Sequence, residues 1–181
     1  MEDLSLHILD IAENSVAASA DRIEIRIAED KKNDLLSIEI IDNGTGMDKD
    51  TIKKALDPFY TSKTVRRIGL GLSLLSESAK AANGKLTIES EKGQGTRVKA
   101  EFQFSHIDRK PLGDIDQTII TLVIGNPDID FFYEIKKNNH THRVDTRTIK
   151  ADHKEISLNS LEGIKLLRKK LQKNKVLHPI S

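Results

Sequence analysis

The chain has 181 residues, a net charge of +1, and 37% hydrophobic against 31% charged residues, a balance typical of a globular protein and not of a disordered or fibrous one. It contains no cysteine, which excludes a disulfide framework and a cysteine-based metal site. No apolar run approaches the length of a membrane span, and the first ten residues lack the basic start of a signal peptide. With 4% aromatic residues and this charge, we expect no nucleic acid as partner. Without a span, a signal peptide or cysteines, we expect a cytoplasmic location and no membrane as partner.

The first 104 residues alternate between helix and strand patterns. Residues 3–19 carry apolar side chains three and four positions apart, which predicts an amphipathic helix with His7, Asp10 and Asn14 on its polar side. Further segments predict, in order, two strands, a short helix, a long helix and two strands: 22–28, 34–41, 48–56, 70–85, 85–90 and 96–104. That order favours an α+β fold, a two-layer α/β sandwich whose helices cover one face of a mixed sheet.

A domain boundary is expected within residues 105–116, where polar residues, Pro111 and Gly113 interrupt the pattern. It divides the chain into a domain at 1–104 and a small C-terminal α/β extension at 105–181. No motif in the extension indicates its role.

Within the extension, the apolar run 118–124 predicts a strand, because such runs are typical of buried strands. Gly125-Asn126-Pro127 predicts a turn, and Asn138-Asn139 predicts a hairpin. A final helix is expected to begin near Asn159, with Glu162 completing a capping box. Its apolar stripe would be formed by Leu161, Ile164, Leu167 and Leu171.

Three glycine-bearing segments interrupt the domain: DNGTG at 42–46, RRIGLGL at 66–72 and GQGT at 93–96. Each alone is consistent with an ordinary turn. Glycine also lets a backbone approach a ligand closely, and the second segment opens a helix whose free N–H groups can bind an anion. A phosphate ligand would bring a divalent cation, for which Asn14 could supply an oxygen while Asp10 orients a water. The alternative for these two residues is a solvated polar stripe.

Residues 57–69 (DPFYTSKTVRRIG) have no clear periodicity. Their polar and basic residues are Thr61, Ser62, Lys63, Arg66 and Arg67. A basic loop beside an anion site is typical of a lid over phosphates, and the alternative is an ordinary exposed loop.

In order and spacing, these segments resemble the GHKL superfamily, the Bergerat-fold ATPases that include DNA gyrase B, MutL proteins and sensor histidine kinases. The stretch HILDIAENSVAASADRIEIRI of this chain resembles the N box of the superfamily and is also similar to MutL-type sequences. The stretch DNGTGM resembles its D-x-G-x-G adenine box. PFYTSK looks like the motif PFFTTK of nitrogen-regulation histidine kinases. GLGLSLL resembles the second glycine box, and GQGTRVKAEF resembles the closing strand. The resemblance covers about residues 4–104 and implies the Bergerat fold and ATP as ligand.

The resemblance implies a role for each matching residue. Asn14 would ligate the Mg²⁺ ion that bridges the phosphates of ATP. Asp42 would accept a hydrogen bond from the adenine amino group, and Thr96 would support the same edge of the base. Gly44 and Gly46 would let the backbone pass close to the base.

On the phosphate side, the cradle would be formed by Gly69, Leu70 and Gly71. Lys63 and Arg67 would lie on the ATP lid, although Arg67 stands where the second glycine box usually begins with another glycine. Asp10 stands where hydrolases of this superfamily place a glutamate general base. It is one methylene shorter, so we expect slow hydrolysis at best.

Three functions fit this resemblance. The first is a histidine-kinase-like domain that transfers the γ-phosphoryl group to a separate partner protein or regulates that protein. Its own phosphoacceptor hairpin is expected to be absent, because only a few residues precede the N box. The second is a slow ATPase of the MutL or gyrase type. The third is a non-enzymatic, ATP-dependent binding module similar to anti-sigma switches, whose lid orders on ATP. The extension could serve as a docking element or support a homodimer.

Overall fold

Alternating apolar and polar residues build a central sheet of six strands. The strands are β1 (Arg22–Asp30), β2 (Leu35–Asp42), β3 (Lys85–Glu91), β4 (Gly95–Gln103), β5 (Asp130–Lys137) and β6 (His140–Asp145). The computed structural model describes residues 3–56, 69–138 and 140–172. In these residues the strand order is β3-β4-β2-β1-β5-β6, with β1 and β5 parallel and the other neighbours antiparallel. The sheet is therefore mixed, as the sequence predicts.

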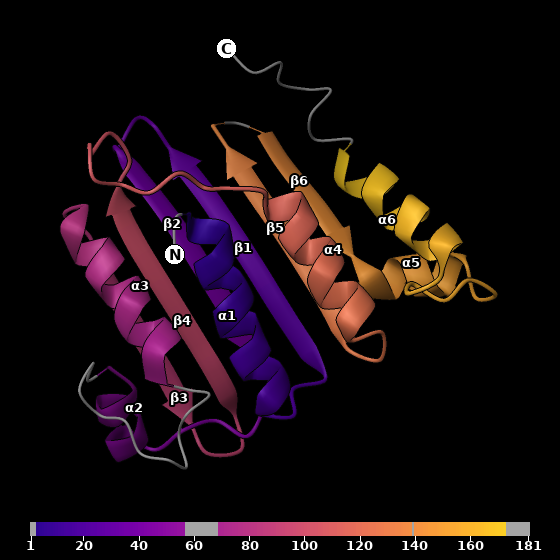
Figure 1. Ribbon diagram of the computed structural model, residues 1–181, viewed down its shortest axis with the longest axis horizontal. Helices are drawn as coiled ribbons and strands as arrows, with labels where there is room; N and C mark the ends of the chain where they lie inside the picture. Colours follow the sequence, from indigo (N-terminus) through magenta and orange to yellow (C-terminus); the bar gives the residue numbers. More distant parts are fainter. Residues whose placement is uncertain (1–2, 57–68, 139, 173–181) are drawn as a thin grey trace.

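The helices cover one face of this sheet. They are α1 (Leu4–Ala17), α2 (Lys49–Leu56), α3 (Gly69–Ala81), α4 (Ile115–Gly125), α5 (Thr146–Asp152) and α6 (Leu161–Gln172). Figure 1 shows α1, α3 and α4 lying across the same face. Ile23, Ile25 and Ile27 of β1 are buried beneath the helices, whereas Glu24 and Arg26 between them are not. This arrangement confirms the predicted two-layer α+β fold. None of the described helices is both long and apolar enough to cross a membrane.

The open face of the sheet carries a row of alternating charge. At one level of the register, neighbouring strands present Lys99, Glu39, Arg26, Glu134 and Arg143, in the order β4, β2, β1, β5, β6. Opposite charges directly across a strand pair stabilise that pairing, and like charges oppose it. The row continues without a break from the strands of the first 104 residues into β5 and β6. The charges therefore favour one register across these five strands.

The residues after 105 continue this sheet and the core beneath it. β5 lies beside β1 and pairs with it over eight residue positions, and α4 packs beside α1. The segment leading into α4 passes the start of α1, where the Leu4 amide donates a 2.9 Å hydrogen bond to the Pro111 carbonyl. Apolar residues from both parts of the chain belong to one buried cluster. The extension thus shares its sheet and core with residues 1–104.

One element of the extension differs from the expectation. Residues 118–124, predicted to form a strand, lie inside helix α4, so that prediction is wrong. Two threonines are the only polar residues of this short run, too few to distinguish a period of 2 from one of 3.6. The helix is defined by its start, where the Asp114 side chain accepts a 3.0 Å hydrogen bond from the Gln117 amide. Its buried positions, three and four apart, include Ile115, Ile119 and Leu122.

The hairpin of the extension follows the prediction. β5 and β6 pair antiparallel around Asn138, whose φ of +54° is one that asparagine tolerates better than most residues. The short helix α5 has no counterpart among the predicted elements. It follows β6 directly, and its first residue, Thr146, is buried and accepts a 2.8 Å hydrogen bond from the Phe131 amide of β5.

The last helix is present, but its start differs in detail. α6 begins at Leu161, and the residue that caps it is Ser160, not Asn159. The Ser160 hydroxyl accepts a 3.1 Å hydrogen bond from the amide three residues later. Of the predicted apolar stripe, Leu167 and Leu171 are fully buried, whereas Leu161 is 72% exposed.

Candidate functional site

A pocket lies between α1, α3 and the ends of β2 and β4. Its volume is about 140 Å³, and much of its wall is apolar: Ile11, Ile40, Leu72 and Val98. Its polar side chains are Asn14, Ser15, Asp42, Thr45 and Thr96. Three residues predicted to form the site, Asn14, Asp42 and Thr96, therefore lie around one cavity although they are far apart in the sequence. Gly46 lines the same cavity.

Asp42 is the last residue of β2, and its carboxylate is held in one orientation. It is only 8% exposed. Its Oδ2 accepts a 2.6 Å hydrogen bond from the Ser15 hydroxyl, and its Oδ1 accepts from the Gly44 amide (2.9 Å) and the Thr96 amide (3.2 Å). A buried carboxylate needs such donors, because it has left water. Three donors fix the direction of the lone pairs that remain for a ligand.

Ser15 is a site residue that the sequence analysis missed. It lies four residues after Ile11 on the buried side of α1 and is 3% exposed. A serine within an apolar stripe needs a hydrogen-bond partner inside the protein. That requirement was the available signal, and the partner is Asp42.

Thr96 is joined to the loop after β2 through Ser90 of β3. The Ser90 hydroxyl lies 2.9 Å from the Thr96 hydroxyl and 2.9 Å from the Gly95 carbonyl oxygen. It also accepts a 2.8 Å hydrogen bond from the Met47 amide. Ser90 does not line the pocket, but it connects two segments that do.

The glycines of the two turns are explained by contacts within the protein. A Cβ on Gly46, which has φ of +66°, would lie 2.0 Å from the Glu91 carbonyl oxygen. A Cβ on Gly44 would lie 2.7 Å from the Ala18 carbonyl oxygen. Only glycine lets the loop after β2 pack this closely against the end of α1 and the β3–β4 hairpin. Gly44 does not line the pocket, and it contributes the amide that binds Asp42.

Asn14 and Asp10 lie one turn apart on α1. The Asn14 side-chain nitrogen is buried without a hydrogen-bond partner among the described residues. Burial raises the pKa of the Asp10 carboxyl above its ordinary value. A Cβ on Gly71 would lie 1.7 Å from the Asp10 Oδ2, so the first turn of α3 packs directly against this carboxylate. The structure thus brings Asp10 and Gly71 together, and it places Asn14 at the pocket.

The remaining predicted residues are described in part or not at all. Gly69 is the first residue of α3, followed by Leu70. Lys63 and Arg67 lie outside the described residues.

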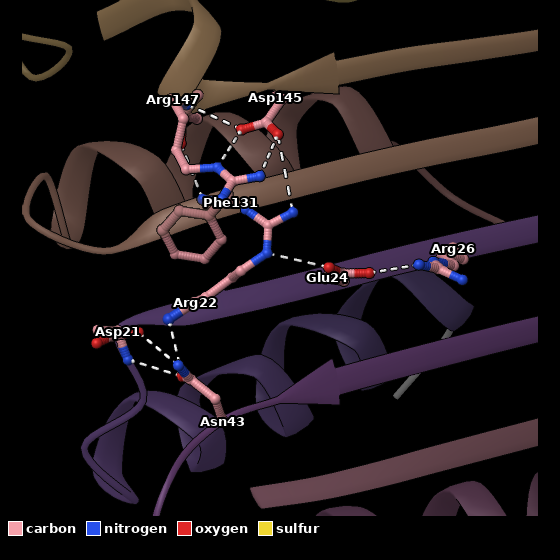
Figure 2. Close-up of polar contacts among 9 residues, drawn as sticks. Asp21, Arg22, Glu24, Arg26, Asn43, Phe131, Asp145 and Arg147 are labelled. Atoms are coloured by element: carbon pink, nitrogen blue, oxygen red, sulfur yellow. Dashed lines mark hydrogen bonds and ion pairs between the residues drawn. The ribbon is translucent and has the colours of Figure 1, made fainter.

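Asn43, beside Asp42, has a role in the fold. Figure 2 shows its side chain between the end of β2 and the start of β1, where it accepts hydrogen bonds from the amides of Asp21 (3.1 Å) and Arg22 (3.0 Å). The guanidinium of Arg22 then lies between Glu24, at 3.0 Å, and Asp145 of the extension, at 3.7 Å. The residue after the buried aspartate therefore fixes the start of β1, which in turn contacts the extension.

Comparisons with known proteins identify the family of the chain. A family model described as histidine kinase-, DNA gyrase B- and HSP90-like ATPase matches residues 2–106. The sensor histidine kinase YxdK of Bacillus subtilis (strain 168) is 34% identical over 90 residues, which are 48% of this chain and 27% of that kinase. The anti-sigma F factor of Clostridium beijerinckii (strain ATCC 51743 / NCIMB 8052) is 30% identical over 109 residues, which are 58% of this chain and 72% of that factor.

A solved structure extends the likeness of the fold to the extension. The N-terminal domain of a DNA repair protein aligns with a TM-score of 0.57 at 19% identity, covering 95% of this chain and 56% of that one. The chain spans about a quarter of the length of the kinase, so the two share one part of that protein. The family model covers more than half of the chain and includes Asn14, Asp42 and Thr96. The chain belongs to the family of histidine kinase-, DNA gyrase B- and HSP90-like ATPases, the GHKL superfamily.

Proposed function

We propose that the protein binds ATP with Mg²⁺ in this pocket and uses it to phosphorylate or regulate a separate partner protein. The observation that carries the proposal is the Asp42 carboxylate, buried at an apolar pocket and held by three donors. An oriented carboxylate in such a place recognises a ligand that offers hydrogen-bond donors. The 6-amino group of adenine does so.

The same carboxylate would discriminate against guanine. The 6-oxygen of guanine is an acceptor, so it would face Asp42 without a hydrogen between them and leave two polar groups unpaired. The apolar residues of the pocket, such as Ile11 and Leu72, would contact the faces of the base. Thr96 and Gly46 would lie at its polar edge.

The residues near α3 suit the phosphates and their cation. The Asn14 side-chain nitrogen, buried without a partner among the described residues, could donate a hydrogen bond to a phosphate oxygen, and the oxygen of the same amide would be the ligand of Mg²⁺. When bound, the ion would neutralise charge on the phosphates. The N-terminal turn of α3, which contains Gly69, Leu70 and Gly71, would offer backbone N–H groups to them. Lys63 and Arg67 would add positive charge from the lid.

The kinase or regulatory role is favoured by the relatives. One matched relative is named a sensor histidine kinase and another an anti-sigma factor, and both names describe proteins that act on, or against, other proteins. Slow hydrolysis is the second candidate. It is supported by Asp10, whose raised pKa suits a general base, although its short side chain limits its reach.

Nucleotide binding is tested by the thermal unfolding midpoint with and without MgATP. The midpoint of the unmodified protein should rise by several degrees at millimolar MgATP. Asp42→Asn should abolish that rise and Asn14→Ala should reduce it, whereas Asp128→Asn at an exposed position should leave it unchanged. A midpoint that MgATP does not move in the unmodified protein would refute the proposal.

The reaction is tested with ATP labelled on the γ-phosphate. Label on a partner protein supports phosphoryl transfer. Free phosphate that Asp10→Asn abolishes supports the slow ATPase. If the protein binds ATP but produces neither, it acts as a nucleotide-dependent binding module.

A further inference from the structure

Helix α6 carries a concentration of positive charge. Its cations are Lys165, Arg168, Lys169 and Lys170, and its one acidic residue is Glu162. Residues 163–181 contain six lysines and arginines and no aspartate or glutamate. Like charges this close repel one another, and no acidic side chain of the same segment offsets that repulsion.

The cations of the sheet have a different environment. Every lysine and arginine in the six strands has a carboxylate oxygen within 3.4 Å: Arg22, Arg26, Lys85, Arg97, Lys99, Lys136, Lys137 and Arg143. None of the four cations of α6 forms an ion pair with a residue that the structure describes. The fold thus neutralises the cations of its sheet and leaves those of α6 to water or to a partner.

The helix itself explains part of this charge. Lys169 and Lys170 lie in the last turn, where cations interact favourably with the carbonyl groups at the C-terminal end of a helix. That interaction falls off beyond the last turn. It does not account for Lys165 or Arg168, which lie before that turn.

An exposed apolar side chain lies in line with these cations. Leu161 is 72% exposed, and Lys165, Arg168 and Lys169 follow it at spacings of four, seven and eight residues. Residues at these spacings lie on one side of a helix. All four side chains are exposed, so α6 presents a row that begins with a leucine and continues with three cations.

Packing fixes the direction in which this row points. The opposite side of α6 is buried, through Gly163, Leu167 and Leu171. A Cβ on Gly163 would lie 2.2 Å from the Ser157 carbonyl oxygen, so the helix packs closely against the loop before it. Figure 1 shows α6 beside α4, on the side of the helical layer away from α3. The row therefore faces outward and lies apart from the base pocket.

The composition of the row decides which class of partner fits. A helix that binds a membrane surface inserts its apolar side, but on α6 that side, with Leu167 and Leu171, is already buried in the core. The phosphates of a nucleic acid would pair with the cations and would gain nothing from Leu161. An acidic protein segment can supply both carboxylates for the cations and an apolar side chain for the leucine.

We propose that the row formed by Leu161, Lys165, Arg168 and Lys169 is a docking surface for an acidic segment of a partner protein, with an apolar side chain beside its carboxylates. This inference deepens the proposed function, which includes a separate partner protein. Because the row lies apart from the base pocket, the partner and the nucleotide can be bound at the same time. Exposed ion pairs contribute little each, so a short segment alone binds weakly.

The test titrates the protein with a designed peptide, without nucleotide, and follows the amide shifts by NMR. The peptide is an alanine-based helix that carries one leucine and three glutamates, placed four, seven and eight residues from the leucine. At low salt it should shift the amides of α6, with a dissociation constant of about 0.1–1 mM. The triple variant Lys165→Gln, Arg168→Gln and Lys169→Gln should weaken binding about tenfold, and Leu161→Ser about fivefold.

Two controls separate this row from charge in general. Lys32→Gln, Lys49→Gln and Lys53→Gln together remove the same charge from exposed positions outside α6, and this variant should bind as the unmodified protein does. Replacing Lys165, Arg168 and Lys169 by glutamate should abolish binding of the acidic peptide and allow binding of a peptide with lysines in place of its glutamates. Should a triple variant fail to fold, Leu161→Ser and Arg168→Gln as single changes should still weaken the acidic peptide.

The outcomes distinguish this inference from the proposed function, because the peptide is titrated without nucleotide. If the shifts lie outside α6, or if the neutralised variant binds as tightly as the unmodified protein, the docking surface is refuted and nucleotide binding stands. A DNA duplex or vesicles with phosphatidylserine that bind α6 more tightly than the peptide at about 150 mM salt would also refute it, by showing another class of partner. Peptide binding as expected in a protein that MgATP does not stabilise would refute the proposed function and leave the docking surface.

Discussion

The Ser15 hydroxyl donates a 2.6 Å hydrogen bond to the Asp42 carboxylate, which joins the last turn of α1 to the last residue of β2. Asn14, the proposed ligand of the cation, is the residue before Ser15. The same short segment of helix thus orients the carboxylate for the base and carries the amide for the metal. The position of α1 on the sheet therefore controls both ends of the proposed nucleotide site.

The first prediction concerns this hydrogen bond. Ser15→Ala removes one of the three donors to Asp42 and leaves its carboxylate less firmly oriented. We expect the dissociation constant for MgATP to rise about five- to tenfold, because a hydrogen bond to a charged group contributes about 1.5–3 kcal/mol and two other donors remain. Calorimetry measures the change. Ser37→Ala, on the open face of β2, is the matched control and should bind as the unmodified protein does; equal affinities in both variants would contradict the prediction.

The second prediction concerns the contact between α1 and α3. Gly71→Ala places a methyl group where the Asp10 carboxylate lies, with Oδ2 at 1.7 Å and Cγ at 2.8 Å. The side chain must move or the helices must separate, and we expect the free energy of unfolding to fall by about 1–3 kcal/mol. Gly125→Ala is the control, because a Cβ there meets nothing within 4 Å.

Removing the obstructing carboxylate should remove the penalty. In an Asp10→Ala background, Gly71→Ala should cost much less, which a double-mutant cycle of urea unfolding measures. Equal costs in the two backgrounds would mean that Asp10 is not what requires a glycine at position 71.

The first 104 residues illustrate why much of the fold could be predicted. Strict alternation in β1 and the three-and-four spacing in α1 define a strand and a helix without help from the rest of the chain. The order of the boxes predicted that Asn14, Asp42 and Thr96 belong to one site, and they lie around one pocket. The predictions of the fold succeeded because each depends on a periodic pattern or on several motifs in order, and the roles assigned to the three site residues stay predictions.

The sequence was less informative where a pattern fits both a helix and a strand, or where the role of a residue depends on a partner far away in the chain. Residues 118–124 carry no periodic signal, and only the cap at Asp114 shows that they are helical. Ser15 and Ser90 look like ordinary polar residues until their partners, Asp42 and Thr96, are in place. Such partners come from distant strands, so no local pattern marks them.

The third prediction concerns pH. His7 is 1% exposed, and neither ring nitrogen has a hydrogen-bond partner among the described residues. Burial, with a smaller contribution from Lys110, lowers the pKa of His7 from 6.5 to about 4. Between these values the unfolded chain binds a proton that the folded protein does not. The free energy of unfolding should therefore fall as the pH falls from 6.5 to 4, by about 3 kcal/mol from this residue.

His7→Met tests that contribution. The variant has no group to protonate, so its free energy of unfolding should decline less steeply between pH 6.5 and pH 4, as urea unfolding at a series of pH values will show. Measurements at pH 8 are the internal control, because His7 is neutral there in both states. There the variant should be as stable as the unmodified protein or more so, since a buried N–H without a partner is removed. Identical slopes in the two proteins would rule out this role for His7.

The fourth prediction concerns whether the extension folds independently. Ile119 of α4 is 1% exposed and belongs to the same buried cluster as the core of β1. Ile119→Ala should lower the free energy of unfolding by about 2–5 kcal/mol, the usual cost of such a cavity. Because β5 pairs with β1, which lies beside β2 and then β4, the loss of stability should extend beyond the extension to β2 and β4.

Hydrogen exchange distinguishes a shared core from two separate ones. If the sheet opens as one cooperative unit, the most protected amides of β2 and β4 should lose protection in Ile119→Ala by the same free energy as those of β5. Thr121→Ala, on the exposed side of the same helix, is the matched control and should change protection little. Loss of protection confined to residues 115–172 would instead show two independent folding units. The expected boundary near residue 104 would then separate domains in stability as well as in sequence, and the proposed site could be studied without its extension.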